Sequence, residues 1–174
     1  MTPKLNHIDE KNNPKMVDVS EKGITHRLAT ANCDIKCDPL IFEQLSDGDI
    51  KTKKGSVFHT AIIAGTMAVK KTSDIIPFCH PLSIEACDFE IKTREELQLI
   101  SIRCCVKISG KTGVEMEALT GVNSALLAIY DLSKIVEPNL KITNTRLLVK
   151  SGGKKGLWIN PNGIPEKIKK VLNL

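Results

Sequence analysis

Two long segments of this chain alternate between apolar and polar side chains at every second position. In residues 26–37 the apolar positions are Ala29, Ala31, Cys33, Ile35 and Cys37. In residues 100–109 they are Ile100, Ile102, Cys104, Val106 and Ile108. A period of two is typical of a β-strand that buries one face and exposes the other. Both segments therefore predict long strands in a sheet with one face covered by other parts of the chain.

Helices are predicted to provide that cover. Residues 56–71 are apolar almost all the way around the helix, and small residues recur at positions 61, 64, 65 and 68. This pattern predicts a buried helix that another backbone approaches closely. A second long helix is predicted from about residue 116 to 136. A short third helix is expected after Asp38, with Pro39 at its first position and Gly48 at its end.

The remaining strands complete the order of elements. Residues 87–91 alternate and are joined to residues 100–109 by the polar connector TREE, and a last strand is expected at about 140–150. Apart from the short helix, the order is β-α-β-β-α-β, which indicates a ferredoxin-like fold of the α+β class, with helices on one face of an antiparallel sheet. We expect one domain at residues 16–156, an N-terminal segment at 1–15, and a C-terminal extension at 157–174 that closes with a short helix.

The charge of the chain favours small anionic ligands. It has 25 Lys and Arg against 20 Asp and Glu, a net charge of +5, and only four of the basic residues are Arg. Lysine acts as a point charge, whereas arginine reads phosphates and base edges through its planar fork. The six aromatic residues, four Phe, one Trp and one Tyr, leave little for stacking single-stranded bases. These observations argue against a nucleic-acid partner.

The distribution of apolar residues and cysteines argues against a membrane partner and a metal site. The longest apolar stretch, residues 61–69, is far shorter than the ~20 residues that cross a bilayer. The polar start of the sequence lacks the apolar core of a leader. The six cysteines lack the paired C-x-x-C spacing of a structural zinc site. We therefore expect a cytoplasmic protein without a metal site and with reduced cysteines.

Two loops have compositions that suit anion binding or acid–base chemistry. Gly110-Lys111-Thr112 resembles the end of a P-loop, but the position five residues before Gly110 is Cys105 rather than glycine, so that motif is incomplete. An anion site at a helix N-terminus and a tight polar turn are the two interpretations left. His80 lies in a loop between two prolines, where it is either a general acid or base or a hydrogen-bonded loop residue.

The second long helix carries charged residues near both ends. Glu115 and Glu117 stand at its start, where carboxylates suit the helix dipole or accept hydrogen bonds from a base edge. Asp131 and Lys134 are three residues apart and share a face. Their apolar neighbours predict a position near the core, where a lysine has a lowered pKa and exchanges protons near neutrality. The alternative is an ordinary surface ion pair.

Lysines stand next to glycines at two further element ends. Lys54 precedes Gly55 in front of the first long helix, and Lys150 begins the run KSGGKKG after the last strand. Such runs offer point charges and backbone N–H groups to a polyphosphate. A solvated basic loop is the alternative interpretation.

Four strings of the sequence, taken in order, resemble one family. They are MVDVSEKG at 16–23, KGSVFHTAIIAGTMAVKKTSDIIPFCHPL at 54–82, GKTGVEMEALTGVNSALLAIYDLSK at 110–134 and RLLVKSGGKKG at 146–156. Together they closely resemble the cyclic pyranopterin monophosphate synthases, which act early in molybdenum cofactor biosynthesis. The departures are mild: Phe78 stands where the family commonly has leucine, and TGVN at 120–123 replaces a run of small residues.

The resemblance implies an activity and an assembly. The family converts 3′,8-cyclo-7,8-dihydroguanosine 5′-triphosphate, a cyclic guanosine triphosphate derivative, to cyclic pyranopterin monophosphate and releases pyrophosphate, which is a lyase reaction. It has a ferredoxin-like fold, in agreement with the predicted strand order. It forms homohexamers, trimers of dimers, with active sites at dimer interfaces. No cofactor is implied by the sequence, although Mg²⁺ could accompany the triphosphate or pyrophosphate.

The resemblance also implies site residues. The catalytic candidates are Asp131, Lys134, Lys54 and Lys150. The substrate-binding candidates are Arg27, Phe78, Cys79, His80, Glu115, Met116 and Glu117. We expect Lys150 to join the other three catalytic candidates in one cluster that handles protons. Arg27 and His80 would hold phosphates or stabilise developing charge, and Glu117 with the backbone of Met116 would fix the purine-derived ring.

Two other classes of protein share this fold. A non-catalytic nucleotide-binding regulator would keep the cleft and lose the chemistry, but the four catalytic candidates are all present. An RNA-binding ferredoxin-like module would stack bases on aromatic residues of the sheet. The predicted strand at residues 97–109 contains no aromatic residue.

Overall fold

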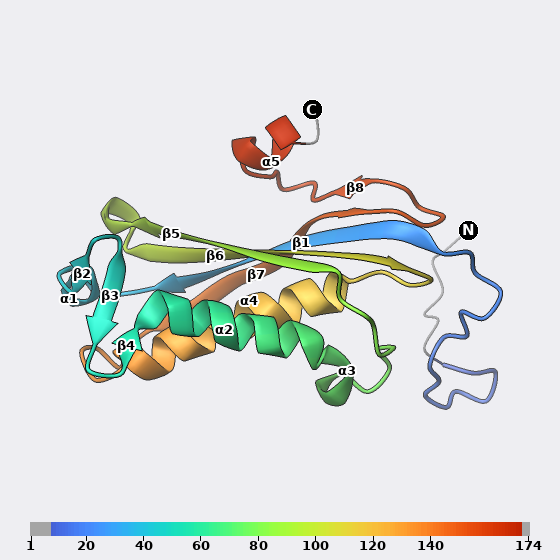
Figure 1. Cartoon of the computed structure of the whole chain (residues 1–174), viewed down its shortest axis with the longest axis horizontal. Helices are drawn as coiled ribbons and strands as arrows, with labels where there is room; N and C mark the ends of the chain where they lie inside the picture. The colour runs from blue at the N-terminus through green and yellow to red at the C-terminus, as the bar shows by residue number, and fades with distance from the viewer. Residues whose placement is uncertain (1–7, 172–174) are drawn as a thin grey trace.

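The computed structural model of the chain describes residues 8–171 (Figure 1). The predicted N-terminal segment therefore falls partly outside the described residues, at positions 1–7. The end of the predicted C-terminal extension, positions 172–174, falls outside them as well.

β1 (Thr25–Lys36) is the central strand of a five-stranded sheet with the order β5-β6-β1-β7-β8. It pairs antiparallel with β6 (Leu99–Gly110) on one side and with β7 (Lys141–Ser151) on the other. β5 (Ala86–Arg94) and β8 (Trp158–Ile159) form the edges, and both also pair antiparallel. Without β8, this is the predicted ferredoxin-like arrangement, so the fold class is confirmed.

Two long helices, α2 (Val57–Lys70) and α4 (Glu115–Ser133), lie side by side under one face of the sheet (Figure 1). The short α3 (Thr72–Ile75) follows α2, and a 3₁₀ turn, η1 (Glu95–Leu97), lies in the connection between β5 and β6. The predicted C-terminal helix is present as α5 (Glu166–Val171). It lies over the opposite face of the sheet from α2 and α4 (Figure 1).

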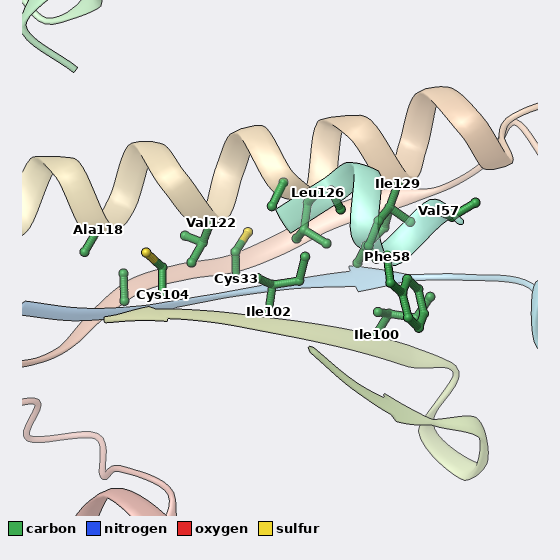
Figure 2. Packing of buried hydrophobic residues seen from close by; sticks show 14 of the residues in the cluster. Cys33, Val57, Phe58, Ile100, Ile102, Cys104, Ala118, Val122, Leu126 and Ile129 are labelled. Carbon is green, nitrogen blue, oxygen red and sulfur yellow. The ribbon is translucent and has the colours of Figure 1, made fainter. Parts of the chain in front are cut away.

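The core lies between the sheet and the two long helices. The alternating apolar residues of β1 and β6 that the sequence predicted to be buried are all enclosed there. They meet the buried face of α4, and Figure 2 shows this layer with Ala118, Val122, Leu126 and Ile129 on the helix and Ile100, Ile102 and Cys104 on the strand. A second, small apolar cluster, formed by Leu148, Val149 and Ile164, lies apart from this core.

The predicted close approach to residues 56–71 occurs where α2 crosses α4. A Cβ atom added to Gly65 would lie 2.5 Å from the ring of Phe89 and 2.9 Å from the carbonyl oxygen of Gly121. The two backbones therefore approach each other as closely as glycine allows.

The Gly65→Ala variant is expected to be less stable than the wild type by about 1–3 kcal/mol, because the added methyl overpacks the α2–α4 contact and outweighs the helix propensity of alanine. The free energy of unfolding from urea denaturation measures this difference. Gly23→Ala is the matched control, since an added Cβ at Gly23 meets no atom within 4 Å. Equal losses in both variants would contradict the packing explanation.

The short helix predicted after Asp38 is only partly correct. α1 (Pro39–Phe42) begins as expected, with the Asp38 side chain accepting a hydrogen bond from the Leu40 backbone, but it ends after one turn. The chain then forms two short hairpins from β2 (Leu45–Ser46), β3 (Asp49–Thr52) and β4 (Gly55–Ser56).

The first hairpin turns at Asp47 and Gly48, which both have positive φ. Two positive φ angles are what a two-residue hairpin turn of type I′ requires, and Asp-Gly is a favoured sequence for it. The prediction that Gly48 ends a helix was wrong for this reason.

The prediction that residues 56–71 form a helix buried all around is also wrong. Ile63 and Met67 of α2 are 61% and 56% exposed. On α4, Leu127 is 58% exposed, and Met116 is exposed as well. Because the sheet covers one side of the helix pair, these residues lie on its uncovered side, and we refer to Ile63, Met67, Met116 and Leu127 as the outer helix surface.

Candidate active site

Most of the predicted substrate-binding residues lie together where α4 begins. A cleft of about 490 Å³ is lined there by the loop before β5, by the first residues of α4 and by the end of β7. We call its predicted members the α4 N-terminal cluster: Phe78, Cys79, His80, Glu115, Met116, Glu117 and Lys150. Segments far apart in the sequence thus form one concave surface with both signs of charge.

Lys150 and Glu115 form the ion pair of this cluster. Lys150 lies near the end of β7 and pairs across the sheet with Ala29, whose side chain is buried under the helices. Its ammonium Nζ is 2.7 Å from Oε1 of Glu115, the first residue of α4. Both side chains are partly buried, so water and salt weaken this pair less than an ordinary surface ion pair. An anionic ligand that enters the cleft would compete with Glu115 for this lysine.

Glu117 is the most deeply buried acid of the cluster, with 4% of its surface exposed. Removal from water raises the pKa of its carboxyl, and the nearby Glu115 carboxylate raises that pKa further. The thiol of Cys79 also has a raised pKa, mainly because of burial and secondly because of Glu117. A buried carboxyl of this kind can accept a proton or exchange hydrogen bonds with the polar edge of a ring.

Arg27 does not point freely into the cleft. Its Nε and Nη2 atoms donate hydrogen bonds to the backbone oxygens of Gly110 and Lys111, each at 3.0 Å. A Cβ atom at Gly153, which has a φ of +70°, would lie 2.4 Å from Nη1 of Arg27. Arg27 therefore joins the loop before α4 to the glycine turn after β7, and two of its hydrogen-bonding nitrogens are already used.

A second cleft, of about 890 Å³, continues from the same ion pair along this turn. Its basic lining residues are Lys22, Arg27, Lys150, Lys154 and Lys155, and its acidic ones are Asp18, Glu21 and Glu115. The sequence analysis interpreted the run KSGGKKG, with Lys154 and Lys155, as a possible polyphosphate site but did not include these lysines or Lys22 among the candidate residues. Their signal was present in the strings VSEKG and SGGKKG, where lysine stands next to glycine in a loop.

The other catalytic candidates form a separate group, the α4 C-terminal cluster, which consists of Lys54, Asp131 and Lys134. Lys54 lies at the tip of the hairpin between β3 and β4, and its charge contributes to lowering the pKa of Asp131. Nζ of Lys134 is 2.7 Å from Oδ1 of Asp131. This hydrogen-bonded pair lowers the pKa of Asp131 and raises that of Lys134.

The prediction that Asp131 and Lys134 lie near the core is wrong for the single chain. Their side chains are 63% and 55% exposed. The buried positions of this turn are Ile129 and Ser133, on the opposite side of the helix. In one chain the pair is therefore a surface ion pair, and the pKa of Lys134 is raised where a buried position would have lowered it.

The two clusters lie at opposite ends of α4. Glu115 and Asp131 are 16 residues apart on the same helix, which corresponds to about 24 Å along its axis. The expectation that Lys150 joins Asp131 is therefore not met within one chain, because Lys150 is bound to Glu115 at the other end. Within one chain, the two clusters therefore do not form a single group.

Residues 8–171 contain no group of three or more His, Cys, Asp or Glu that could hold a metal ion. In the same part of the chain, no helix has the length and apolar character of a membrane span.

Comparison with known proteins places these residues in a family. Residues 16–153 match the sequence model of the MoaC family. The chain belongs to the MoaC family. The cyclic pyranopterin monophosphate synthase of Xanthomonas oryzae is 47% identical over 154 residues, 88% of this chain and 93% of the relative. That of Campylobacter jejuni is 47% identical over 156 residues, 90% and 98% of the two chains.

A longer relative contains the same region within a larger protein. The molybdenum cofactor biosynthesis bifunctional protein of Synechocystis is 48% identical over 159 residues, which are 89% of this chain and 46% of the relative. All eleven candidate residues, from Arg27 to Lys150, lie within the MoaC match. The C-terminal residues 154–171, with β8 and α5, lie beyond it.

The buried acid of this MoaC chain has a testable effect on stability. Because burial raises the pKa of Glu117 above its ordinary value of 4.5 in the folded protein, the folded state holds a proton that the unfolded chain releases. Its contribution to stability is present below about pH 4.5 and is lost as the pH rises through the raised pKa. Glu117→Gln, which stays neutral, should gain stability relative to the wild type as the pH rises above about 4.5 and through the raised pKa of Glu117. Urea denaturation across this range measures the gain, and a pH-independent difference would contradict it.

Proposed function

We propose that this chain converts 3′,8-cyclo-7,8-dihydroguanosine 5′-triphosphate to cyclic pyranopterin monophosphate with release of pyrophosphate. The relatives that carry this synthase name align with the chain over nearly their whole length. Their names and the MoaC match support an enzyme of molybdenum cofactor biosynthesis.

The observation that carries this proposal is the complementary chemistry of the two ends of α4. One end has a buried acid, a cleft and several lysines, which suit a purine-derived ring and a triphosphate. The other end has Asp131 between Lys134 and Lys54, a compact group for moving protons. A reaction that opens one ring, closes a cyclic phosphate and expels pyrophosphate needs both kinds of site.

The outer helix surface supports a dimer that joins these two ends. Large apolar residues at Ile63, Met67 and Leu127 face water in the single chain, and such patches are typical of interfaces. Met116, Leu127 and Asp131 share this exposed side of α4. A two-fold axis across the middle of α4 pairs the helix with an antiparallel copy. The Asp131 end of one chain then faces the Glu115 end of its partner. Three such dimers make the proposed homohexamer.

The proposed roles of the residues follow from their positions. Lys150, Lys22, Lys154 and Lys155 neutralise the triphosphate, whose charge of about four units point charges can balance without the planar fork of arginine. His80 lies beside this charge in the first cleft. Any Mg²⁺ enters on the phosphate oxygens of the substrate, and the reaction takes place in the cytoplasm.

At the reacting end, Asp131 and Lys134 exchange protons with the substrate, and Lys54 stabilises negative charge that develops there. The buried Glu117 and the backbone of Met116 hold the ring from the first cleft, with Cys79 and Phe78 forming its wall. Arg27 keeps the two phosphate-binding loops together rather than serving as a free phosphate ligand.

The decisive experiment incubates the purified protein with the cyclic dihydroguanosine triphosphate. Mass spectrometry follows the pterin product, and a coupled assay follows pyrophosphate. Formation of both in equal amounts supports the proposal. Saturable binding of the substrate without either product would instead identify a non-catalytic nucleotide-binding regulator.

A further inference from the structure

The sole tryptophan of the chain, Trp158, stands on β8, outside the MoaC match. β8 continues the sheet beyond β7, and Trp158 is paired directly opposite Lys150. Directly opposite residues of an antiparallel pair project from the same face, with Cβ atoms about 4.5–5.5 Å apart. The indole is therefore the cross-strand neighbour of a lysine that the two clefts share.

The next residue of β8 fixes which face this is. Ile159 is opposite Val149 and packs with it in the small apolar cluster that also contains Leu148 and Ile164. Side chains alternate along a strand, so Trp158 projects from the other face. That is the helix side, where Lys150 reaches Glu115 at the start of α4.

Two hydrogen bonds hold β8 in this register. The Asn160 backbone N–H donates to the carbonyl oxygen of Leu148 at 2.8 Å, and its side-chain amide donates to that of Leu147 at 2.7 Å. The turn that leads back from β7 contains three glycines with positive φ, at 152, 153 and 156. The position of Trp158 beside Lys150 is thus set by backbone pairing and not by the indole alone.

The neighbouring indole changes the surroundings of Lys150 in two ways. An indole directly opposite a lysine can pack against its aliphatic stem and keep that stem from water. The face of an indole also attracts an ammonium group by a cation–π interaction. Trp158 itself is 37% exposed, so most of its surface is withdrawn from water.

We propose that Trp158 is a positioning residue that holds Lys150 in place for the triphosphate of the substrate. This inference rests on the proposed function for its role in turnover, but not for the contact itself. The indole keeps the ammonium group at the junction of the two clefts. A phosphate that binds there then replaces Glu115 as the partner of Lys150. The lysine loses little conformational entropy in this exchange, because its aliphatic stem is already held.

The kinetic test compares Trp158→Leu, Trp158→Phe and Leu157→Ala. Trp158→Leu should lower kcat/KM for the triphosphate substrate about tenfold, whereas Trp158→Phe, which keeps an aromatic face, should recover most of that loss. Leu157→Ala changes an exposed apolar residue next to it and should behave as the wild type. Wild-type kcat/KM in Trp158→Leu would overturn the proposal.

A fluorescence test separates positioning of Lys150 from a merely structural role. The emission of the sole tryptophan should change when inorganic pyrophosphate binds, because Lys150 then moves relative to the indole. Lys150→Met, which keeps a long stem without the charge, should shift the emission of the free protein and abolish its response to pyrophosphate. An emission spectrum that stays the same on addition of pyrophosphate and in Lys150→Met would overturn the proposal. The fluorescence measurement does not depend on turnover. A protein that releases no product would therefore contradict the proposed function, while the emission would still test whether Trp158 contacts Lys150.

Discussion

Mixing a Lys54→Ala chain with a Lys150→Ala chain is expected to restore pyrophosphate release that neither variant shows alone. Each variant should lose turnover by a factor of about 10²–10³ or more, since each removes a positive charge from one half of the site. Lys54 belongs to the α4 C-terminal cluster and Lys150 to the N-terminal cluster. The helix residues of these clusters, Asp131 and Glu115, are about 24 Å apart along the α4 axis. A mixed dimer therefore contains one site with both defects and one site with neither.

Random reassociation makes half of the dimers mixed, so about a quarter of all sites should be intact. The measurement is pyrophosphate release after the two variants are dissociated together and allowed to reassemble. The matched control is a mixture of Lys54→Ala with Lys134→Ala, whose defects lie in the same cluster. Every site of that mixed dimer carries one defect, so no activity should return. Recovery in neither mixture, with mixed dimers demonstrated by mass spectrometry, would contradict a site shared between two chains.

The architecture could be predicted from local pattern because the strands of this chain are long and strictly periodic. The alternating apolar residues of β1 and β6 are buried at every second position, as predicted. That regularity fixes which face carries α2 and α4, and with it the fold class. The prediction that the other face of β1 is exposed is wrong, since Thr30, Asn32 and Asp34 are buried too. The Asp34 carboxylate accepts hydrogen bonds from Asn32 and Asn144. The close contact of the two helices was also predictable, since small residues such as Gly65 have few other uses inside a helix.

Two predictions failed because the local sequence does not show which side of a helix a residue faces or which kind of turn a glycine forms. Asp131 and Lys134 were expected near the core since apolar residues surround them in the sequence. On the helix, however, the buried residues of that segment are Ile129 and Ser133, and the charged pair lies on the opposite side. At Asp47 and Gly48 a hairpin turn was interpreted as a helix end, because glycine with positive φ serves both.

The division of the site between two ends of α4 could not be predicted from spacing at all. Motif order gives the residue types, but it contains no information on which motifs meet in space. The structure separates Lys150 from Asp131, and it leaves apolar residues uncovered between the two clusters. A second chain that covers the outer helix surface would account for both observations, since it would bury the apolar residues and bring its own cluster to the site. The exposed face of α2, which the sequence predicted to be buried, then becomes buried in the dimer.

Each of the single substitutions Leu127→Glu and Ile63→Glu is therefore expected both to dissociate the dimer and to abolish turnover. Each side chain is about 60% exposed in the single chain, so a charge there costs the isolated fold little. At a dimer interface the same substitution removes about 1.5–3 kcal/mol of apolar burial per side chain and adds the cost of burying a carboxylate. The two-fold axis applies this penalty twice in each dimer.

Light scattering measures the assembly, circular dichroism the fold, and pyrophosphate release the activity. Leu97→Glu is the matched control, because Leu97 is a comparably exposed leucine in η1, away from the helices. The control should keep the wild-type mass and turnover, while Leu127→Glu and Ile63→Glu stay folded as smaller, inactive species. The loss of activity then stems from separating Asp131 of one chain from Lys150 of its partner, since neither variant changes a charged residue of either cluster. A Leu127→Glu protein with wild-type mass and turnover would show that the outer helix surface is not the interface.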